Sequence, residues 1–323
     1  MNSFGSKFRI SIFGESHGDM IGVIMDGVPP GVALCVEDFK EQLGRRRAGA
    51  LGTTQRIESD VPSIVSGIKD GATTGAPLTV VFRNENVDSK SYASFEVMPR
   101  PGHADFTSSV KYLGWNDLRG GGHFSGRMTL CLVAAGVVAR RAFFEEGDDV
   151  SAKVVEIGGH RDATEWDEVL RSAMSEGDSV GGVVECCMPC PLIGLGEPFF
   201  DSVESMISHL VFSIGGVRGI EFGDGFEAAR MRGSEHNDSI VDVRGRTSSN
   251  GAGGVNGGIT NGNPLVFRVA VKPTSSIAKA QQTFDFEKEV PCELEIKGRH
   301  DTCIALRFPP IVEAVVYIAL ANC

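Results

Sequence analysis

The stretch RGGGHFSGRMTLCLVAAGVVARRAFFE, residues 119–145, joins a glycine triplet to the longest apolar run of the chain. That run, residues 130–139, ends at Arg140 and Arg141, and we predict a helix over residues 127–145. Ser125 stands where a helix N-cap belongs. A glycine turn that leads into a helix N-terminus can bind an anion, because free N–H groups and the helix dipole point outward. A purely structural turn before a core helix is the alternative.

The residues around the triplet favour a binding site. Within residues 100–129 the chain carries two histidines, His103 and His123, and four cations. Those cations are Arg100, Lys111, Arg119 and Arg127. Three successive glycines also let a backbone approach a ligand closely and adopt positive φ without strain.

Size and composition indicate an ordinary globular protein. The chain has 323 residues with 41% hydrophobic and 23% charged side chains. It has neither a Pro/Ser-rich linker nor a repeat period, so we expect one domain over residues 1–323. A net charge of −11 argues against a general nucleic-acid or membrane-surface binder.

Localisation and metal binding follow from what the sequence lacks. The ten-residue apolar run is too short for a bilayer, which needs about 20 residues. The first residues do not have a signal-peptide pattern, so we expect a cytoplasmic protein. Cys187 and Cys190 form a C-x-x-C pair without a second pair or nearby histidines, so we expect no metal site. A metal or redox role for this pair is the minor alternative.

The order of expected elements predicts the fold class. Strands are expected at residues 8–13, 21–25, 63–68, 77–82, 150–157, 179–188, 217–222 and 264–271. Helices are expected at residues 36–47, 127–145, 164–175, 201–214 and 310–321. Because strands and helices do not alternate regularly, we predict α+β layers and not a doubly wound sheet. Residues 84–106 are interpreted as a functional loop.

Cations beside glycine turns point to anionic ligands. Arginine has a fork of donors that matches phosphate and carboxylate. The arginines in such settings are Arg46, Arg100, Arg119, Arg127 and Arg299. Lys272 precedes Pro273, Thr274, Ser275 and Ser276, which offer hydroxyls and amides beside the cation. Any single one of these residues is more often a surface cation, but together they favour one polyanionic ligand or two anionic ligands.

Histidines on tight loops point to proton transfer. His17, His103 and His300 each stand between glycine and polar residues, and a histidine there can reach a ligand and titrate near neutrality. A loop histidine is often exposed and idle, and the sequence does not place the three together. The phosphate-binding P-loop and the hydrolase nucleophile elbow are both missing from the sequence. The residues therefore indicate an enzyme that acts on a phosphorylated, carboxylated small molecule by acid–base chemistry.

From end to end the chain resembles the chorismate synthases. The matching stretches are FGESHG (13–18), DGVPPG (26–31), RRRAG (45–49), TTGAP (73–77), RPGHADFT (100–107), RGGGHFSGR (119–127), GDGF (223–226), AGGVNGGITNG (252–262), KPTSSI (272–277) and KGRHDTC (297–303). The resemblance implies the layered helix/sheet sandwich of that family. It implies a lyase of the shikimate pathway, in aromatic amino acid biosynthesis.

The resemblance also implies a reaction and its partners. The reaction is the 1,4-anti elimination of phosphate from 5-enolpyruvylshikimate 3-phosphate, which gives chorismate without net redox change. The family needs reduced FMN, with NADPH as a candidate reductant of the flavin, and it forms homotetramers. Neither nucleic acid nor a membrane is expected as a partner.

Roles carry over by motif. His17 would assist the departing phosphate, His103 would supply a proton to the reduced flavin, and Asp301 would act with the flavin in removing the ring proton. The flavin-contacting positions are His123, Phe124, Ser125, Gly257, Lys272, Pro273, Thr274, Ser275, Ser276 and Arg299. The positions for the substrate or NADPH are Arg46, Arg47, Arg100 and Arg127.

The chain departs from the family text just after the glycine triplet. His123 replaces a cation and Phe124 a hydroxyl, so contacts there would involve the backbone or different side chains. Two alternatives stay open. One is a flavin-binding or ligand-binding relative without turnover; the other is an unrelated phosphotransferase, against which the missing nucleotide-phosphate motif argues.

Overall fold

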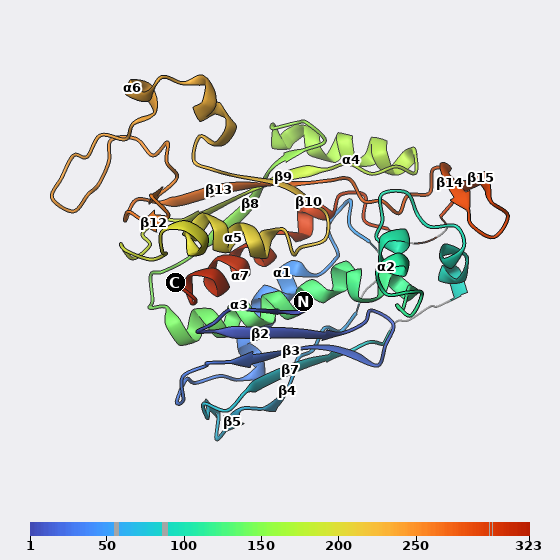
Figure 1. Cartoon of the computed structure of the whole chain (residues 1–323), viewed down its shortest axis with the longest axis horizontal. Helices are drawn as coiled ribbons and strands as arrows, with labels where there is room; N and C mark the ends of the chain where they lie inside the picture. Colours follow the sequence, from blue (N-terminus) through green and yellow to red (C-terminus); the bar gives the residue numbers. More distant parts are fainter. Residues whose placement is uncertain (55–57, 86–89, 297, 299) are drawn as a thin grey trace.

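The computed structural model describes residues 1–54, 58–85, 90–296, 298 and 300–323. Two antiparallel sheets enclose a layer of helices, and a further helix covers the outer face of the second sheet (Figure 1). The α+β class predicted from the sequence is confirmed.

The first sheet consists of N-terminal strands. Its spatial order is β1 (Ser3–Phe4), β2 (Arg9–Gly14), β3 (Met20–Asp26), β7 (Leu78–Arg83) and β4 (Ser63–Ser66). Side chains alternate between faces with the period of a strand. On β7, Leu78, Val80 and Phe82 are therefore buried against the helices.

The second sheet comes from the rest of the chain. Its order is β10 (Val217–Phe222), β13 (Leu265–Val271), β9 (Gly182–Met188) and β8 (Ser151–Ile157). On β13, the buried side chains are those of Leu265, Phe267, Val269 and Val271. The chain leaves β13 directly into the Lys272 loop, so this sheet positions that loop.

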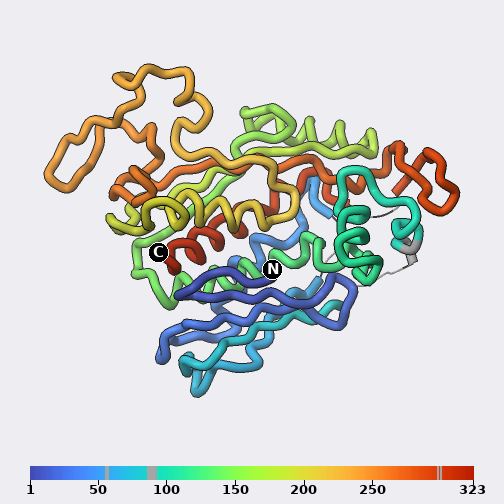
Figure 2. Tube along the Cα trace, viewed as in Figure 1, coloured from blue at the N-terminus to red at the C-terminus, as the bar shows by residue number. Residues whose placement is uncertain are grey.

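Helices fill the space between the sheets. They are α1 (Lys40–Arg46), α3 (Thr129–Phe143), α5 (Val203–Val211) and α7 (Pro309–Leu320), while α4 (Trp166–Ser175) lies outside the second sheet (Figure 1). Figure 2 traces α7 through the middle of the molecule. Residues 129–139 of α3 and 310–320 of α7 are buried all round, as expected for helices of a central layer. Gly136 permits the close approach, because a β-carbon there would lie 2.3 Å from Cβ of Ala314.

Some elements were not expected from the sequence. Helix α2 (Asp105–Lys111) begins within the last two residues of the predicted functional loop. The hairpin of β14 (Gln281–Asp285) and β15 (Val290–Leu294) lies near it in Figure 1. Short pairs are formed by β5 (Ile68–Lys69) with β6 (Ala72–Thr73) and by β11 (Val255–Asn256) with β12 (Ile259–Thr260).

A single buried apolar cluster connects both sheets through the helices. It supports the single domain over residues 1–323, which we retain as a proposal. Residues 223–264 include an arm around α6 (Gly233–His236) that extends away from the sheets in Figure 1. Within the described ranges, none of the helices is both long and apolar enough to cross a bilayer.

Candidate active site

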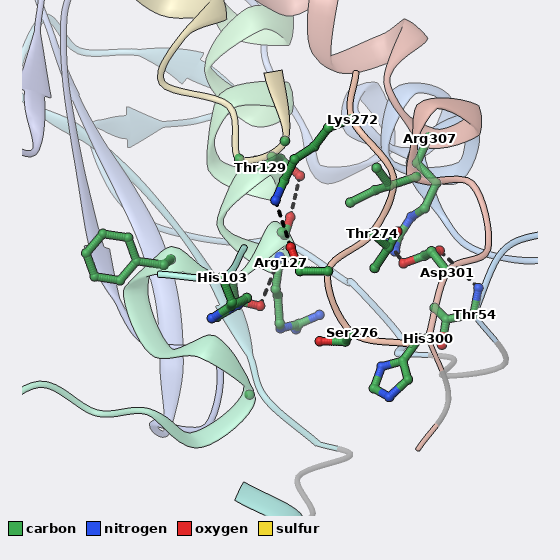
Figure 3. A pocket seen from close by; sticks show the side chains of 18 of the residues that line it. Thr54, His103, Arg127, Thr129, Lys272, Thr274, Ser276, His300, Asp301 and Arg307 are labelled. Carbon is green, nitrogen blue, oxygen red and sulfur yellow. Dashed lines mark hydrogen bonds and ion pairs between the residues drawn. The ribbon is translucent and has the colours of Figure 1, made fainter. Parts of the chain in front are cut away.

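A cavity of about 640 Å³ lies where the loops after β13, before α2 and before α3 meet the end of the chain preceding α7. Figure 3 shows side chains from these loops around it. Its described lining has seven Lys or Arg side chains and three Asp or Glu, an excess of four positive charges in a protein of net charge −11. The cations are Arg46, Arg47, Arg100, Arg127, Arg218, Lys272 and Arg307.

Gly120 of the glycine triplet lines the cavity, and the triplet, called the glycine wall below, lies against both predicted acid histidines. Gly120 and Gly121 have φ of +60° and +81°. A β-carbon on Gly120 would lie 2.1 Å from the ring of His17, and one on Gly121 would lie 3.5 Å from Nε2 of His103. The missing side chains thus bring the backbone between two imidazoles. Ser125 ends the turn and caps the next one, accepting a hydrogen bond from the Arg127 amide at 3.3 Å.

His103 belongs to a buried network. Its Nδ1 lies 2.6 Å from Oδ1 of Asp105, and Arg100 donates to both oxygens of that carboxylate through Nε at 2.7 Å and Nη2 at 2.8 Å. Burial alone would raise the pKa of the Asp105 carboxyl, but hydrogen bonds from Arg100 and His103 outweigh it and hold that pKa well below its ordinary 3.8. Nη1 of Arg100 donates to Oγ of Ser276 at 3.0 Å and so joins this network to the Lys272 loop.

Two further arginines share one carboxylate. Asp60 Oδ1 accepts from Nη1 of Arg127 at 2.7 Å, and Asp60 Oδ2 lies 3.6 Å from Nη1 of Arg46. Arg46 also donates to Thr129 Oγ1 and the Gly126 carbonyl, both at 2.9 Å. Burial and the nearby charge of Arg307 lower the pKa of Arg46 to about 9. This corner of the cavity therefore favours an added anion.

The Lys272 loop is folded onto the turn that carries His103. Nζ of Lys272 donates to the Gly102 carbonyl at 2.5 Å and to Oγ of Ser275 at 2.7 Å, and that hydroxyl donates to the same carbonyl at 2.8 Å. Burial, with the charge of Arg218, lowers the pKa of the Lys272 ammonium. Figure 3 shows Lys272 and Ser276 on the same loop.

Asp301 also lines the cavity, and Figure 3 draws it on the opposite side from His103. Its Oδ1 accepts the Thr54 amide at 3.0 Å and its Oδ2 accepts from Nη1 of Arg307 at 3.2 Å (Figure 3). The adjacent His300 also lines the cavity. Burial, with the charge of Arg100, lowers the pKa of His300, which favours a neutral imidazole.

Two buried polar atoms of the lining lack partners among the described residues: Oγ1 of Thr274 and Nε2 of His300. Buried polar groups normally form hydrogen bonds, so these two atoms point to a polar ligand. With the glycine wall and the surplus cations, they fit a flat, phosphorylated cofactor beside an anionic substrate. Among the described residues, no cluster of three potential metal ligands occurs.

Most predicted site residues line this cavity. They are His103, Phe124, Ser125, Lys272, Pro273, Thr274, Ser275, Ser276, Asp301, Arg46, Arg47, Arg100 and Arg127. Arg100 and Arg127 each have protein partners at all three guanidinium nitrogens. Each therefore lines the cavity while it is also bonded to a carboxylate, Asp105 for Arg100 and Asp60 for Arg127.

Three predicted residues are placed differently, and a fourth is not among the described residues. His17 is buried behind Gly120, with its ring edge-on to Tyr92. His123 points away: its Nδ1 bonds to the Gly14 carbonyl at 2.8 Å and its Nε2 to Asn2 Oδ1 at 3.2 Å. Gly257 lies in the turn between β11 and β12, and Figure 1 draws β12 and α2 at opposite ends of the molecule. Arg299 is outside the described residues.

Sequence reasoning missed Asp60, Arg218 and Arg307 in the lining. Asp60 and Arg307 do not stand beside a glycine turn, which was the signal used to select cations. Arg218 does, between Gly216 and Gly219, but it belongs to the segment 217–222 that was interpreted as a strand. Asp60 has a positive φ of +50°, a backbone feature that the sequence did not reveal.

Comparisons with known proteins agree with one another. The sequence profile described as chorismate synthase matches residues 8–323. The chain is 56% identical over 322 residues to the chorismate synthase of Chitinophaga pinensis, covering 100% of this chain and 96% of the relative. It is 44% identical to that of Korarchaeum cryptofilum, covering 99% and 96%. A crystal structure of chorismate synthase matches with a TM-score of 0.75 at 26% identity, covering 99% of this chain and 92% of the other.

Proposed function

The chain belongs to the chorismate synthase family, and on that premise we propose that the cationic cavity carries out the family's reaction with the residues described above. The reaction is the 1,4-anti elimination of phosphate from 5-enolpyruvylshikimate 3-phosphate, a step of the shikimate pathway that yields chorismate. The protein is thus a lyase that acts on a small-molecule substrate.

The observation that carries the proposal is the surplus of positive charge in the cavity. Seven cations against three acids suit a substrate with one phosphate and two carboxylates, together with a second phosphate on the cofactor. Electrostatic stabilisation of a leaving phosphate in an enclosed site is a large catalytic effect. The acidic remainder of the protein makes this local concentration of cations difficult to explain otherwise.

The family implies a flavin, and we propose reduced FMN. Bound there, it would supply the electron density needed to break the C–O bond. Phe124, Ser125 and residues 272–276 would hold it, with Oγ1 of Thr274 as a donor that lacks a partner among the described residues. Arg299 and the backbone at His123 stay predicted flavin contacts.

The protein's own groups would move protons and hold anions. His103 would deliver a proton to the flavin from Nε2, and Asp301 would take up the ring proton of the substrate. His17, behind Gly120, would assist the leaving phosphate. Arg46, Arg47 and Arg127 would hold the substrate anions or NADPH.

We also propose a homotetramer in the cytoplasm. Large exposed apolar side chains lie on the arm and near it, among them Val243, Phe199 and Phe200. If Gly257 contacts a flavin, its place away from the cavity means that this flavin belongs to another copy. Light scattering with and without FMN tests the assembly.

The central experiment supplies the purified protein with 5-enolpyruvylshikimate 3-phosphate and photoreduced FMN without oxygen. We expect chorismate to accumulate, and none without FMN. A protein that binds FMN tightly without forming chorismate would support the relative without turnover and overturn this proposal. Oxidised FMN with NADPH as sole reductant then tests whether the chain reduces its own flavin.

A further inference from the structure

Asp105 is almost completely buried, with 1% of its surface exposed, and does not line the cavity. It is the first residue of α2, where the helix dipole stabilises a carboxylate. Its side-chain oxygens, however, accept from Arg100 and His103. A buried carboxylate bonded to a histidine of the cavity wall points to a role beyond starting a helix.

The geometry determines which nitrogen of His103 carries its proton. Nδ1 lies 2.6 Å from a carboxylate oxygen, and two acceptors would repel each other at that distance. Nδ1 is therefore the donor, and Nε2 has the lone pair in the neutral ring or a second proton in the cation. Arg100 Nη2, 3.1 Å from Nδ1, donates to the same Asp105 oxygen.

Nε2 is consequently the ring nitrogen that is not bonded to Asp105. It lies on the side of Gly121, where a β-carbon would be 3.5 Å away, and the ring lines the cavity. Lys272 brings a further charge to this turn, since its ammonium bonds to the carbonyl of Gly102, the residue before His103. Arg100 cannot turn away easily, because its three nitrogens are divided between Asp105 and Ser276.

We propose that Asp105, held by Arg100, is a positioning residue for the reaction: it binds Nδ1–H of His103 and so presents Nε2 to the cavity as the site of proton transfer. The catalytic role of Asp105 rests on the proposed function, whereas the protonation of His103 at Nδ1 does not. When Nε2–H gives up its proton, the ring becomes neutral and keeps Nδ1–H. Asp105 stays ionised throughout, so the step moves one proton only.

The first test is on the unmodified protein and does not need turnover. Nitrogen-15 NMR of histidine-labelled protein reports which ring nitrogen is protonated, with His103 identified by its loss in H103A. We expect Nδ1–H at a pH where the ring is neutral. A neutral His103 with its proton on Nε2 would overturn the inference, whatever the enzyme's activity.

The second test is a double-mutant cycle in the anaerobic chorismate assay. D105A is expected to lower kcat about 10²-fold, the low end of what a positioned proton donor contributes, with KM for the substrate nearly unchanged. D105N keeps one acceptor oxygen for His103 and should lose less. In an H103A background D105A should cost almost nothing more, because Asp105 acts through His103.

If D105A lowered kcat by the same factor in the wild-type and H103A backgrounds, Asp105 would have a structural role only, and the proposal would be contradicted. The failure of the inference and that of the proposed function are distinguishable. An inactive wild-type protein with His103 protonated at Nδ1 rejects the function alone. An active wild type with a multiplicative cycle rejects the inference alone.

Discussion

Gly120 lies directly against His17, so closely that a β-carbon on the glycine would be 2.1 Å from the imidazole ring. The contact explains why a glycine is needed at this point of the cavity wall. The backbone there has a φ of +60°, which disfavours other residues in any case. Conformation and space thus both require the glycine.

The Gly120→Ala variant is expected to displace His17 and lower the rate of chorismate formation about 10²-fold, because a proton donor moves out of position. Gly71→Ala is the matched control: its φ is +78° and nothing lies within 4 Å of the added carbon. Both carry backbone strain of about 1–2 kcal/mol. Equal rates for the two variants would show that the contact with His17 is unimportant.

Replacing Asp60 should mainly affect stability. Asp60→Asn retains a side chain that tolerates positive φ but leaves Arg46 and Arg127 without their shared carboxylate. Removing one partner of a buried ion pair typically costs about 3–5 kcal/mol in the free energy of unfolding. Urea denaturation measures it. D149N breaks an exposed pair with Arg140 and should cost about 0–1 kcal/mol; a similar loss in both would refute the argument from burial.

Much of the fold could be predicted because it follows from local pattern. The uniform apolar run of residues 130–139 indicated α3, and alternation over residues 8–13 indicated β2. Helix α2 was missed because DFTSSVK leaves Phe106 and Val110 exposed and so lacks a buried apolar stripe. The β14–β15 hairpin was missed because charged and polar residues dominate it, with Pro291 in its second strand.

The site was predictable only as far as its motifs. RPGHAD and KPTSS marked the loops that meet at the cavity. The pairing of Asp60 with Arg127 spans 67 positions and depends on how the sheet and α3 are placed, which residue spacing does not encode. Family motifs alone also could not reveal that the His123 side chain turns toward Gly14.

Lys272 offers a test of flavin binding. Lys272→Met should weaken FMN binding at least about tenfold, because a hydrogen bond to a charged group is typically worth about 1.5–3 kcal/mol. Fluorescence titration with FMN measures the dissociation constant. Lys279→Met changes a lysine of the same segment that pairs with Asp178 and does not line the cavity, so it should bind FMN normally. Equal affinities would remove Lys272 from the flavin site.

The lowered pKa of Asp105 should make the free energy of unfolding depend on pH. The pKa of the Asp105 carboxyl is lower in the folded protein than the unfolded value of 3.8. Between these two pKa values the unfolded chain therefore binds more protons than the folded protein. The stability from Asp105 is therefore complete above about pH 4 and is lost as pH falls through the folded pKa. The gap in unfolding free energy between wild type and D105N should narrow from pH 5 to pH 3. The exposed D167N serves as the control; a gap that stays constant would contradict the linkage.

The two histidines beside the glycine wall should be needed for turnover. His17→Ala and His103→Ala are each expected to lower kcat by about 10²–10⁴-fold as acid catalysts. His160→Ala is the control, since His160 pairs with Glu165 and does not line this cavity. Stopped-flow assays with photoreduced FMN give the rates. A histidine whose removal leaves kcat unchanged has no place in the mechanism.

The elimination without net redox change in this cavity is tested most directly by the number of chorismate molecules formed per reduced FMN without oxygen. We predict many turnovers per flavin, one phosphate released per chorismate, and flavin that is still reduced at the end. Product that stops at one chorismate per flavin, or flavin that ends oxidised in proportion to product, would contradict the account.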